Sequence, residues 1–372
     1  MKNLSVYVHI PFCVKKCDYC DFLSAPSDEN TKTEYVDRLL EEIEKEAENY
    51  RDYSVVSVFF GGGTPSVLKT EDTARIMSAL QKHLKIAKTA EITSEVNPKT
   101  ADDEKLKAYR KMGFNRLSIG LQSTVDEELK TLGRIHDYSD FLAVYKAARE
   151  AGFENINIDL MSALPGQTLE SYRKSVERVL ALKPEHISAY SLILEEGTPF
   201  FERYEETDEE LDREMYMLTG ELLKKNGYFR YEISNYAKEG YECRHNKAYW
   251  ERQDYVGFGI GAASLVENRR FRNQSDLKTY LAGVVEKEEC TVLTEKECME
   301  EFMFLGLRLV QGVSKAKFLE QFGTDMEQVY GEVLEKMEKQ GLLVNGEEWV
   351  CLTQKGLDVS NYVMAEFLFE ED

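Results

Sequence analysis

Short apolar runs alternate with amphipathic segments along the first two-thirds of the chain. Several of these runs are almost continuously apolar, which is typical of strands buried on both faces. In the first amphipathic segment, Tyr35, Leu39 and Ile43 recur on one helical face. The predicted strands are residues 4–10, 55–60, 91–96, 116–121, 155–161 and 186–194, and the predicted helices are residues 33–50, 71–84, 102–112, 138–151 and 169–182.

Six strand–helix units in series predict a parallel sheet, because consecutive parallel strands are joined by right-handed helical crossovers. The number falls short of the eight units of a closed barrel. We therefore expect an α/β fold in the form of an open, partial (β/α)6 barrel. Active sites of barrels of this kind gather at the carboxyl ends of the strands, so functional side chains are expected there.

The last third of the chain has a mainly helical pattern. Segments 297–309, 315–322, 326–340 and 353–368 are predicted helices, and residues 341–350 form a predicted hairpin with Asn345-Gly346 at its turn. This order resembles a winged-helix module. Its surface is acidic rather than basic, which favours a lid or docking role. We divide the chain into a barrel (1–230), a connecting segment (231–275) and a winged C-terminal domain (276–372).

Charge and hydropathy narrow the possible partners. The 372 residues carry a formal net charge of −21, which argues against nucleic acid because binding there depends on cations that neutralise phosphates. No apolar run is long enough to cross a bilayer, and the first strand begins too early to leave room for a signal peptide. We expect a cytoplasmic protein whose acidic residues lie on solvated helix faces, among them Glu41, Glu42, Glu44, Glu46 and Glu48.

Three of the seven cysteines, Cys13, Cys17 and Cys20, follow the first predicted strand in a C-x3-C-x2-C pattern. Structural zinc normally has four protein ligands, and no fourth cysteine or histidine lies nearby on the far side of the triad. Three thiolates suit a [4Fe–4S] cluster with one open iron. The scattered cysteines are expected to be small buried residues, and they are Cys243, Cys290, Cys298 and Cys351.

An iron without a protein ligand can bind the amino and carboxylate groups of S-adenosylmethionine. The reduced cluster then gives one electron to the sulfonium and yields a 5′-deoxyadenosyl radical, chemistry that the cofactor supplies and the protein positions. The cysteine loop, with Tyr19 between its last two ligands, resembles that of the radical SAM superfamily. Gly61-Gly62-Gly63-Thr64-Pro65 after the second strand strengthens this resemblance, because backbone without side chains lets the cofactor approach closely.

The resemblance also implies a cofactor site at the ends of the later strands. Carboxylates there can accept hydrogen bonds from ribose hydroxyls, and Arg134 can pair with the carboxylate of S-adenosylmethionine. The positions that match the cofactor contacts of the superfamily are Tyr7, Tyr19, Gly62, Gly63, Thr64, Glu95, Gln122, Arg134 and Asp159.

Nearly the whole chain resembles the group around oxygen-independent coproporphyrinogen III oxidase, which includes the oxidase and a branch regarded as haem chaperones. The oxidase has a further cysteine two residues past the triad, where this chain has Phe22. The oxidase also has a longer N-terminal extension, whereas three residues precede the first predicted strand here. Both departures favour the haem-chaperone branch. The oxidase, a true enzyme, is the alternative.

The sequence His245-Asn246-Lys247-Ala248-Tyr249-Trp250 matches the H-N-x-x-Y-W signature of the haem-chaperone branch. The resemblance implies that His245, Asn246, Tyr249 and Trp250 take part in haem binding. A histidine can bind haem iron axially, and aromatic rings can pack on the porphyrin. The axial ligand is left open between His245 and Cys243, with Cys243 disfavoured.

The resemblance further implies that haem is the cargo and that it passes to an acceptor protein, and it allows a homodimer. Residues 255–262 are rich in glycine but lack the spacing and the strand–helix context of a dinucleotide site. We expect this segment to be a close-packed crossing near the cofactor or the haem.

Overall fold

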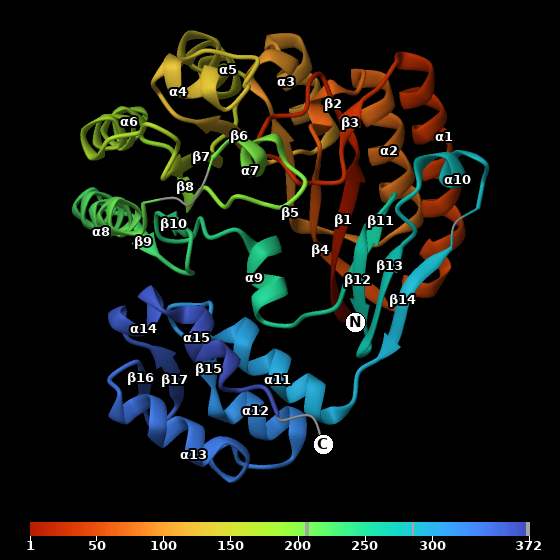
Figure 1. The fold of residues 1–372 in the computed structure, drawn as a ribbon. Helices are drawn as coiled ribbons and strands as arrows, with labels where there is room; N and C mark the ends of the chain where they lie inside the picture. The colour runs from red at the N-terminus through yellow and green to blue at the C-terminus, as the bar shows by residue number, and fades with distance from the viewer. Residues whose placement is uncertain (205–207, 285, 370–372) are drawn as a thin grey trace.

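The computed structural model describes residues 1–204, 208–284 and 286–369. One large sheet forms its centre, with strands in the order β14-β13-β12-β11-β1-β4-β5-β6-β7-β8-β10-β9 (Figure 1). The six predicted strands are its parallel middle, and they are β1 (Lys2–Ile10), β4 (Tyr53–Gly62), β5 (Ile86–Val96), β6 (Arg116–Gln122), β7 (Ile156–Ser162) and β8 (His186–Ser191). The prediction of an open, partial (β/α)6 barrel is confirmed.

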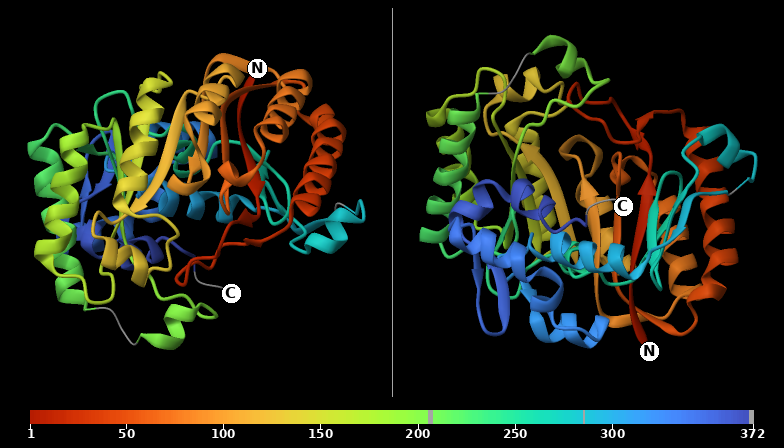
Figure 2. Two further views of the ribbon diagram at one scale, coloured as in Figure 1. Left: turned by 90° about the horizontal axis from the view of Figure 1, so that it is seen from above. Right: turned by 60° about the horizontal axis from the view of Figure 1, so that its bottom comes forward.

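Helices between the strands form the outer layer, which Figure 2 shows ringing the strands. The first of them contains the apolar face predicted from Tyr35, Leu39 and Ile43, and all three are fully buried. Gly113 adopts the left-handed conformation, with φ of 104°, that ends its helix. These helices are α1 (Glu29–Glu46), α2 (Thr70–His83), α3 (Asp103–Met112), α4 (Asp126–Thr131), α5 (Tyr138–Glu150), α6 (Leu169–Leu182), α7 (Pro199–Arg203) and α8 (Glu209–Lys225), with 3-10 turns at Ala47–Tyr50, Pro65–Val67 and Pro98–Thr100.

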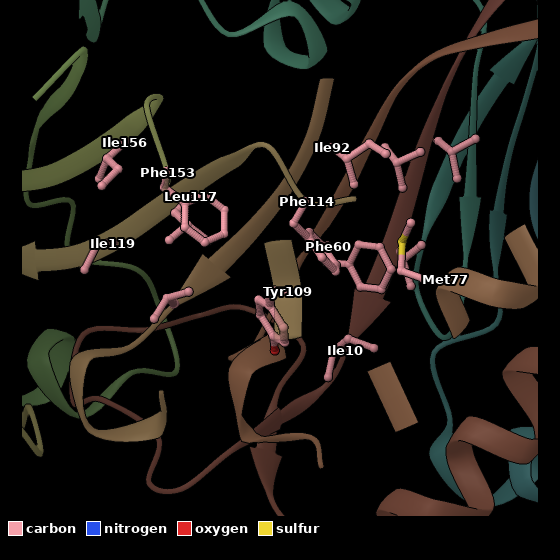
Figure 3. Close-up of a cluster of buried hydrophobic side chains, with 14 of the residues drawn as sticks. Ile10, Phe60, Met77, Ile92, Tyr109, Phe114, Leu117, Ile119, Phe153 and Ile156 are labelled. Atoms are coloured by element: carbon pink, nitrogen blue, oxygen red, sulfur yellow. The ribbon is translucent and has the colours of Figure 1, made fainter. Parts of the chain in front are cut away.

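The main core lies between the sheet and this outer layer. Figure 3 shows part of it, where Phe60 of β4 meets Phe114 and Tyr109 beside Ile92 of β5. The Phe60 and Phe114 rings lie 5.1 Å apart at 64°, and Tyr109 stacks on Phe114 at 4.9 Å. Edge-to-face and stacked pairs of this kind add to the apolar burial that fixes the strand order.

Both edges of the parallel sheet are extended by later parts of the chain. β11 pairs parallel with β1, and three antiparallel strands follow it; on the other side β10 pairs antiparallel with β8. The segment predicted as a connection thus contributes strands to the main sheet, and the domain limits stay a prediction. These elements are β9 (Phe229–Arg230), β10 (Asn235–Ala237), α9 (Arg244–Trp250), β11 (Tyr255–Phe258), β12 (Ala263–Val266), β13 (Arg269–Asn273), α10 (Leu277–Leu281) and β14 (Lys287–Val292).

A second, separate core belongs to the C-terminal helices, which lie below the sheet in Figure 1. The predicted hairpin is present, and β15 adds a third strand to it. The predicted last helix is divided into two at Val359. The elements are α11 (Glu295–Gly306), β15 (Val313–Ser314), α12 (Lys315–Phe322), α13 (Met326–Lys339), β16 (Leu343–Asn345), β17 (Trp349–Leu352), α14 (Gln354–Asp358) and α15 (Ser360–Ala365). Among the described helices, none is long and apolar enough to span a membrane.

A buried carboxylate joins α1 to the extension of the sheet. Glu42 is 2% exposed, so the expectation that it lies on a solvated face was wrong. Its oxygens accept hydrogen bonds from the Gly259 amide at 3.0 Å, the Tyr280 hydroxyl at 2.6 Å and the Asn273 amide at 2.7 Å. Burial raises the pKa of the Glu42 carboxyl. The donors come from segments more than 200 residues away, so this contact fixes where the extension packs.

Replacing Glu42 with alanine should lower the free energy of unfolding by about 3 kcal/mol or more, because three buried donors lose their acceptor. Urea unfolding would measure the change. Glu41→Ala is the matched control, since Glu41 is exposed on the same helix and pairs with Arg38 at its surface. Equal losses in both variants would contradict the anchoring role of Glu42.

Candidate functional site

The cysteine loop lies at the carboxyl end of β1, where the fold predicts chemistry. Cys13 ends the short strand β2 (Phe12–Cys13), which pairs with β3 (Ala25–Pro26). Cys13, Cys17 and Cys20 are all free thiols of intermediate exposure. The Thr64 hydroxyl donates to Cys13 Sγ at 3.6 Å, and the Arg134 guanidinium donates to Cys17 Sγ at 3.6 Å. Hydrogen bonds to the cysteine sulfur atoms are among the features that set the potential of an iron–sulfur cluster.

The three thiols suit a cluster better than a single ion. Across the described residues, no group of three or more His, Cys, Asp or Glu side chains gathers where one metal ion would be held. In a cubane each thiolate binds a different iron, so the sulfur atoms need not share one point. The positive charge of Arg134 also offsets part of the negative charge that three thiolates bring.

The glycine run holds the loop against β4. The Gly63 amide donates to the Ile10 carbonyl at 2.8 Å, and the Thr64 amide donates to the Phe12 carbonyl at 2.8 Å. A Cβ at Gly63 would stand 2.7 Å from the Phe12 carbonyl oxygen, and one at Gly62 would stand 2.5 Å from the ring of His9. The glycines are therefore required for packing against the protein itself, in addition to any approach of a cofactor.

Glu95 and Asp159, the two carboxylates predicted to contact the cofactor, lie on β5 and β7, on either side of β6. Burial, together with the charge of Asp159, raises the pKa of Glu95 to about 8. Burial also raises the pKa of Asp159, although Asn157 donates to it at 2.7 Å. The charge of Asp159 acts on Glu95, so β5 and β7 bring these side chains near one another. Two such acids can accept hydrogen bonds from vicinal hydroxyls.

Gln122 and Arg134 complete the same face. Gln122 is buried in the left-handed region with φ of 71°, and its side-chain oxygen accepts from the Tyr190 hydroxyl at 3.2 Å. Arg134 donates to the Gly120 carbonyl at 2.7 Å, while its buried Nε has no partner in the described structure. An unused guanidinium donor beside the cysteine loop suits a carboxylate ligand. The ring of Tyr19 packs on Phe200 at 6.2 Å, which fixes the loop between its last two cysteines.

A cavity of about 570 Å³ begins beside these residues and extends to the C-terminal domain. This volume lies in the range of small-molecule sites, roughly 300–1,000 Å³. A larger hollow of about 900 Å³ lies between α6, α8 and α14, and none of the predicted site residues lines it. The smaller cavity is lined by Tyr7, His9, Phe22, Leu23, Gly62, Glu95, Tyr249, Trp250, Tyr255, Gly261, Ala263, Leu265, Arg270 and Leu305.

The H-N-x-x-Y-W sequence forms α9, which lies between the sheet and the C-terminal helices (Figure 1). Tyr249 and Trp250 line the cavity, whereas His245 and Asn246 are not among its lining residues. His245 is 1% exposed, and its ring nitrogens share hydrogen bonds with the Ser57 hydroxyl at 2.9 Å and the Tyr249 hydroxyl at 2.8 Å. Burial, together with the charge of Arg116, lowers the pKa of His245 to about 3, so its ring is neutral.

A buried polar network that holds α9 was missed in the sequence. Glu91 of β5 accepts from the amides of Arg244 and His245, both at 3.1 Å, and from the Cys243 thiol at 3.5 Å. Arg116 is 2% exposed, and Glu91 is among the groups whose charge acts on it. Residues two apart share a face of a strand, so the spacing of Glu91, Thr93 and Glu95 was the available signal.

The four scattered cysteines fall into two groups. Cys243 and Cys298 are buried, as predicted. Cys290 is exposed on the edge strand β14 and Cys351 is half-buried, so the expectation of burial was wrong for Cys290. β14 is an edge strand, and most of its side chains, including that of Cys290, are exposed to solvent.

Family models match most of the chain. The Radical SAM superfamily matches residues 7–179, and the HemN C-terminal domain matches residues 293–359. The fold is similar to that of coproporphyrinogen III oxidase from Escherichia coli, a radical SAM enzyme, with a TM-score of 0.87 and 26% identity over 98% of this chain and 90% of that one. Fold and site thus define a radical SAM protein, whose cofactors are a [4Fe–4S] cluster and S-adenosylmethionine.

Similarity to named proteins identifies the family within the radical SAM superfamily. The heme chaperone HemW of Bacillus subtilis is 38% identical over 98% of this chain and 99% of that protein. HemW of Escherichia coli is 34% identical, with coverage of 99% and 98%. A mitochondrial radical S-adenosyl methionine domain-containing protein 1 from Danio rerio is 31% identical, with coverage of 98% and 87%. The chain belongs to the HemW family, and the predicted resemblance to the haem-chaperone branch is confirmed.

Replacing Cys17 with alanine should abolish the broad cluster absorbance after anaerobic reconstitution, because a cubane held by two thiolates loses a third of its protein ligands. Iron analysis would accompany the spectrum. Cys290→Ala is the control, since Cys290 is an exposed cysteine far from the loop along the chain. Four irons retained by the Cys17 variant would show that the ligand assignment is wrong.

Glu95→Gln should change the stability of the cofactor-free chain in a pH-dependent way. The pKa of Glu95 is raised from 4.5 to about 8 in the folded state, so the folded chain holds this proton more tightly than the unfolded chain. Its stabilising effect is full below about pH 4.5 and is lost as the pH rises toward about 8. The variant should match the parent Tm near pH 5 and exceed it near pH 8, by roughly 2–4 °C per kcal/mol.

A Tm difference between Glu95→Gln and the parent that is equal at both pH values would contradict this assignment. Glu127→Gln is a suitable control, since Glu127 is exposed on α4 and its pairing with Lys130 lies at the surface.

Proposed function

We propose that the chain is a haem chaperone that binds one haem in the 570 Å³ cavity, beside the site of its cluster and S-adenosylmethionine. One observation carries this proposal. The cavity is lined by Tyr249 and Trp250 from the H-N-x-x-Y-W helix and also by Tyr7, Gly62 and Glu95, which are predicted to contact S-adenosylmethionine. One space therefore joins the family signature to the radical SAM site.

The composition of the cavity wall suits a porphyrin. Five aromatic side chains, from Tyr7, Phe22, Tyr249, Trp250 and Tyr255, line it together with Leu265 and Leu305. Aromatic faces stack on flat conjugated ligands, and the aliphatic residues remove apolar surface of the ligand from water. Phe22 and Leu23 also line the cavity while remaining 61% and 40% exposed, so the cavity reaches the surface beside the cysteine loop.

His245 acts through Tyr249 in this proposal. Both of its ring nitrogens are already engaged, by Ser57 and by Tyr249, and direct ligation of iron would require one of these bonds to break. The ring holds the Tyr249 hydroxyl and so orients a side chain of the cavity wall. Glu91 in turn holds the start of α9, and Asn246 occupies the same first turn of that helix.

The residues of the cysteine loop position the other cofactors. The cluster, once reduced, supplies an electron for cleavage of S-adenosylmethionine. Cys13, Cys17 and Cys20 would hold the cluster, Arg134 would pair with the carboxylate of S-adenosylmethionine, and Glu95 and Asp159 would accept its ribose hydroxyls. Gly62, Gly63, Thr64 and Gln122 would border this site, and Tyr7 would contribute to both this site and the cavity.

We further propose that the protein works in the cytoplasm, delivers haem to an acceptor protein and can form a homodimer. Haem as cargo follows from the relatives, which carry the name heme chaperone. The net charge of −21 supports a protein acceptor rather than a nucleic acid as partner.

An anaerobic haemin titration of the reconstituted protein should saturate near one haem per chain, followed by the Soret band. His245→Ala should weaken binding by roughly 10-fold, since the orientation of Tyr249 is lost with one hydrogen bond. Tyr249→Phe should have a similar effect, and the double variant should show little further loss because the two side chains act as a unit. His83→Ala, on the outer helix α2, is the control.

Failure to bind haemin stoichiometrically would contradict the proposed function. Anaerobic turnover of coproporphyrinogen with reductant and S-adenosylmethionine would then favour the oxidase alternative, which the structural similarity to coproporphyrinogen III oxidase makes the natural second test. Equal haem affinity of the His245→Ala variant and the parent would contradict the supporting role of His245.

A further inference from the structure

Two arginines share one buried glutamate where the C-terminal domain meets the sheet. Glu301 of α11 is 6% exposed. It pairs with Arg252, which follows α9, at 2.8 Å and with Arg270 of β13 at 2.8 Å. Each guanidinium nitrogen of Arg252 has a partner, since it also donates to the Asn268 side chain at 2.9 Å and to Cys298 Sγ at 3.1 Å. Two positive charges against one negative charge leave this cluster with an excess of one cation.

Arg270 places this unbalanced positive charge at the wall of the cavity. It is the one lysine or arginine among the residues that line the cavity, and its side chain is 41% exposed. Its contact with Glu301 uses one terminal nitrogen, and its buried Nε has no partner within the described residues. A guanidinium with donors to spare binds a carboxylate in a bidentate manner. Arg270 therefore presents a site for an anionic group at the wall of an otherwise largely apolar cavity.

We propose that Arg270 binds a propionate carboxylate of the porphyrin and so sets the orientation of the haem. This assignment rests on the proposed function, because it names how that cavity recognises its ligand. A porphyrin with propionates combines a flat apolar body with carboxylates on one edge. The cavity offers aromatic walls and a single guanidinium, which matches both features.

The opposite side of the cavity disfavours the propionates. Glu95, the one acidic residue among the described residues that line it, belongs to β5, and five strand spacings separate β5 from β13 in the sheet. At about 4.8 Å per spacing, these strands lie roughly 24 Å apart along the curved sheet. A carboxylate near Glu95 would meet a like charge or an acid that must stay protonated. The cavity thus has an anion-accepting side at β13 and an anion-repelling side at β5.

The C-terminal domain takes part in this recognition. Glu301, which orients Arg270, and Leu305, which lines the cavity, lie one helical turn apart on α11. A bound carboxylate would draw on the Arg270 donors that Glu301 does not use, so the ion pair with Glu301 can remain. The domain therefore supplies both a wall of the cavity and the group that positions its anion site.

The test compares haemin with its dimethyl ester, which keeps the iron and the macrocycle and lacks the carboxylates. Both are titrated against the reconstituted chain in one detergent-containing buffer. Arg270→Gln should weaken haemin binding by about 10- to 30-fold, the loss of one charge-assisted hydrogen-bonded pair. The same variant should leave the affinity for the ester unchanged, which also shows that the cavity is intact. Arg270→Lys should recover part of the affinity for haemin.

Arg272→Gln is the matched control, because Arg272 lies two residues along the same strand and pairs instead with Glu288 and Glu289 at the edge of the sheet. It should bind both ligands as the parent does. Equal weakening of haemin and ester in Arg270→Gln, or unchanged haemin binding, would overturn the carboxylate assignment alone. Absence of binding of both ligands to the parent chain would overturn the proposed function, and the assignment would fall with it.

Discussion

The pairing of β1 with β4 on one side and β11 on the other is the constraint on which both proposed sites depend. All three strands run parallel, so their carboxyl ends meet at one edge. β1 leads into the cysteine loop, β4 ends in the glycines that hold this loop, and β11 begins the wall of the cavity. A slip of one residue in either register would turn Tyr7 from the interior of the barrel into the core behind it.

Buried carboxylates join the distant parts of this acidic protein in addition to its apolar contacts. Glu42 joins α1 to the sheet extension, Glu91 joins β5 to α9, and Glu301 joins α11 to β13. Each is satisfied by two or more donors, as a buried charge must be. Directional contacts of this kind fix relative placement, whereas apolar surfaces alone can slide. The walls of the haem cavity come from these same joined segments.

Much of the barrel could be predicted from the sequence, because strands buried on both faces and helices buried on one have distinct periods. All six parallel strands lie where expected, whereas the cofactor residues stay a prediction from motifs at strand ends. The buried role of Glu42 was missed, although its distance of three residues from Leu39 and seven from Tyr35 places it on the apolar face. Its partners are more than 200 residues away along the chain. The periodicity of a helix predicts which face is buried, but it does not predict which segment packs against that face. The partner of His245 could not be predicted either. Its motif indicates a functional residue, and only the fold shows that its ring is hydrogen-bonded to the Tyr249 hydroxyl.

Tyr7, Gly62 and Glu95, which are predicted to contact S-adenosylmethionine, also line the cavity proposed for haem. Where two ligands that share a wall influence each other's binding, the effect of one on the affinity of the other is reciprocal by the same factor. Retention and release of cargo would then be governed by the occupancy of a neighbouring nucleoside site. In that case S-adenosylmethionine would act as an allosteric effector of haem transfer, whether or not it is consumed.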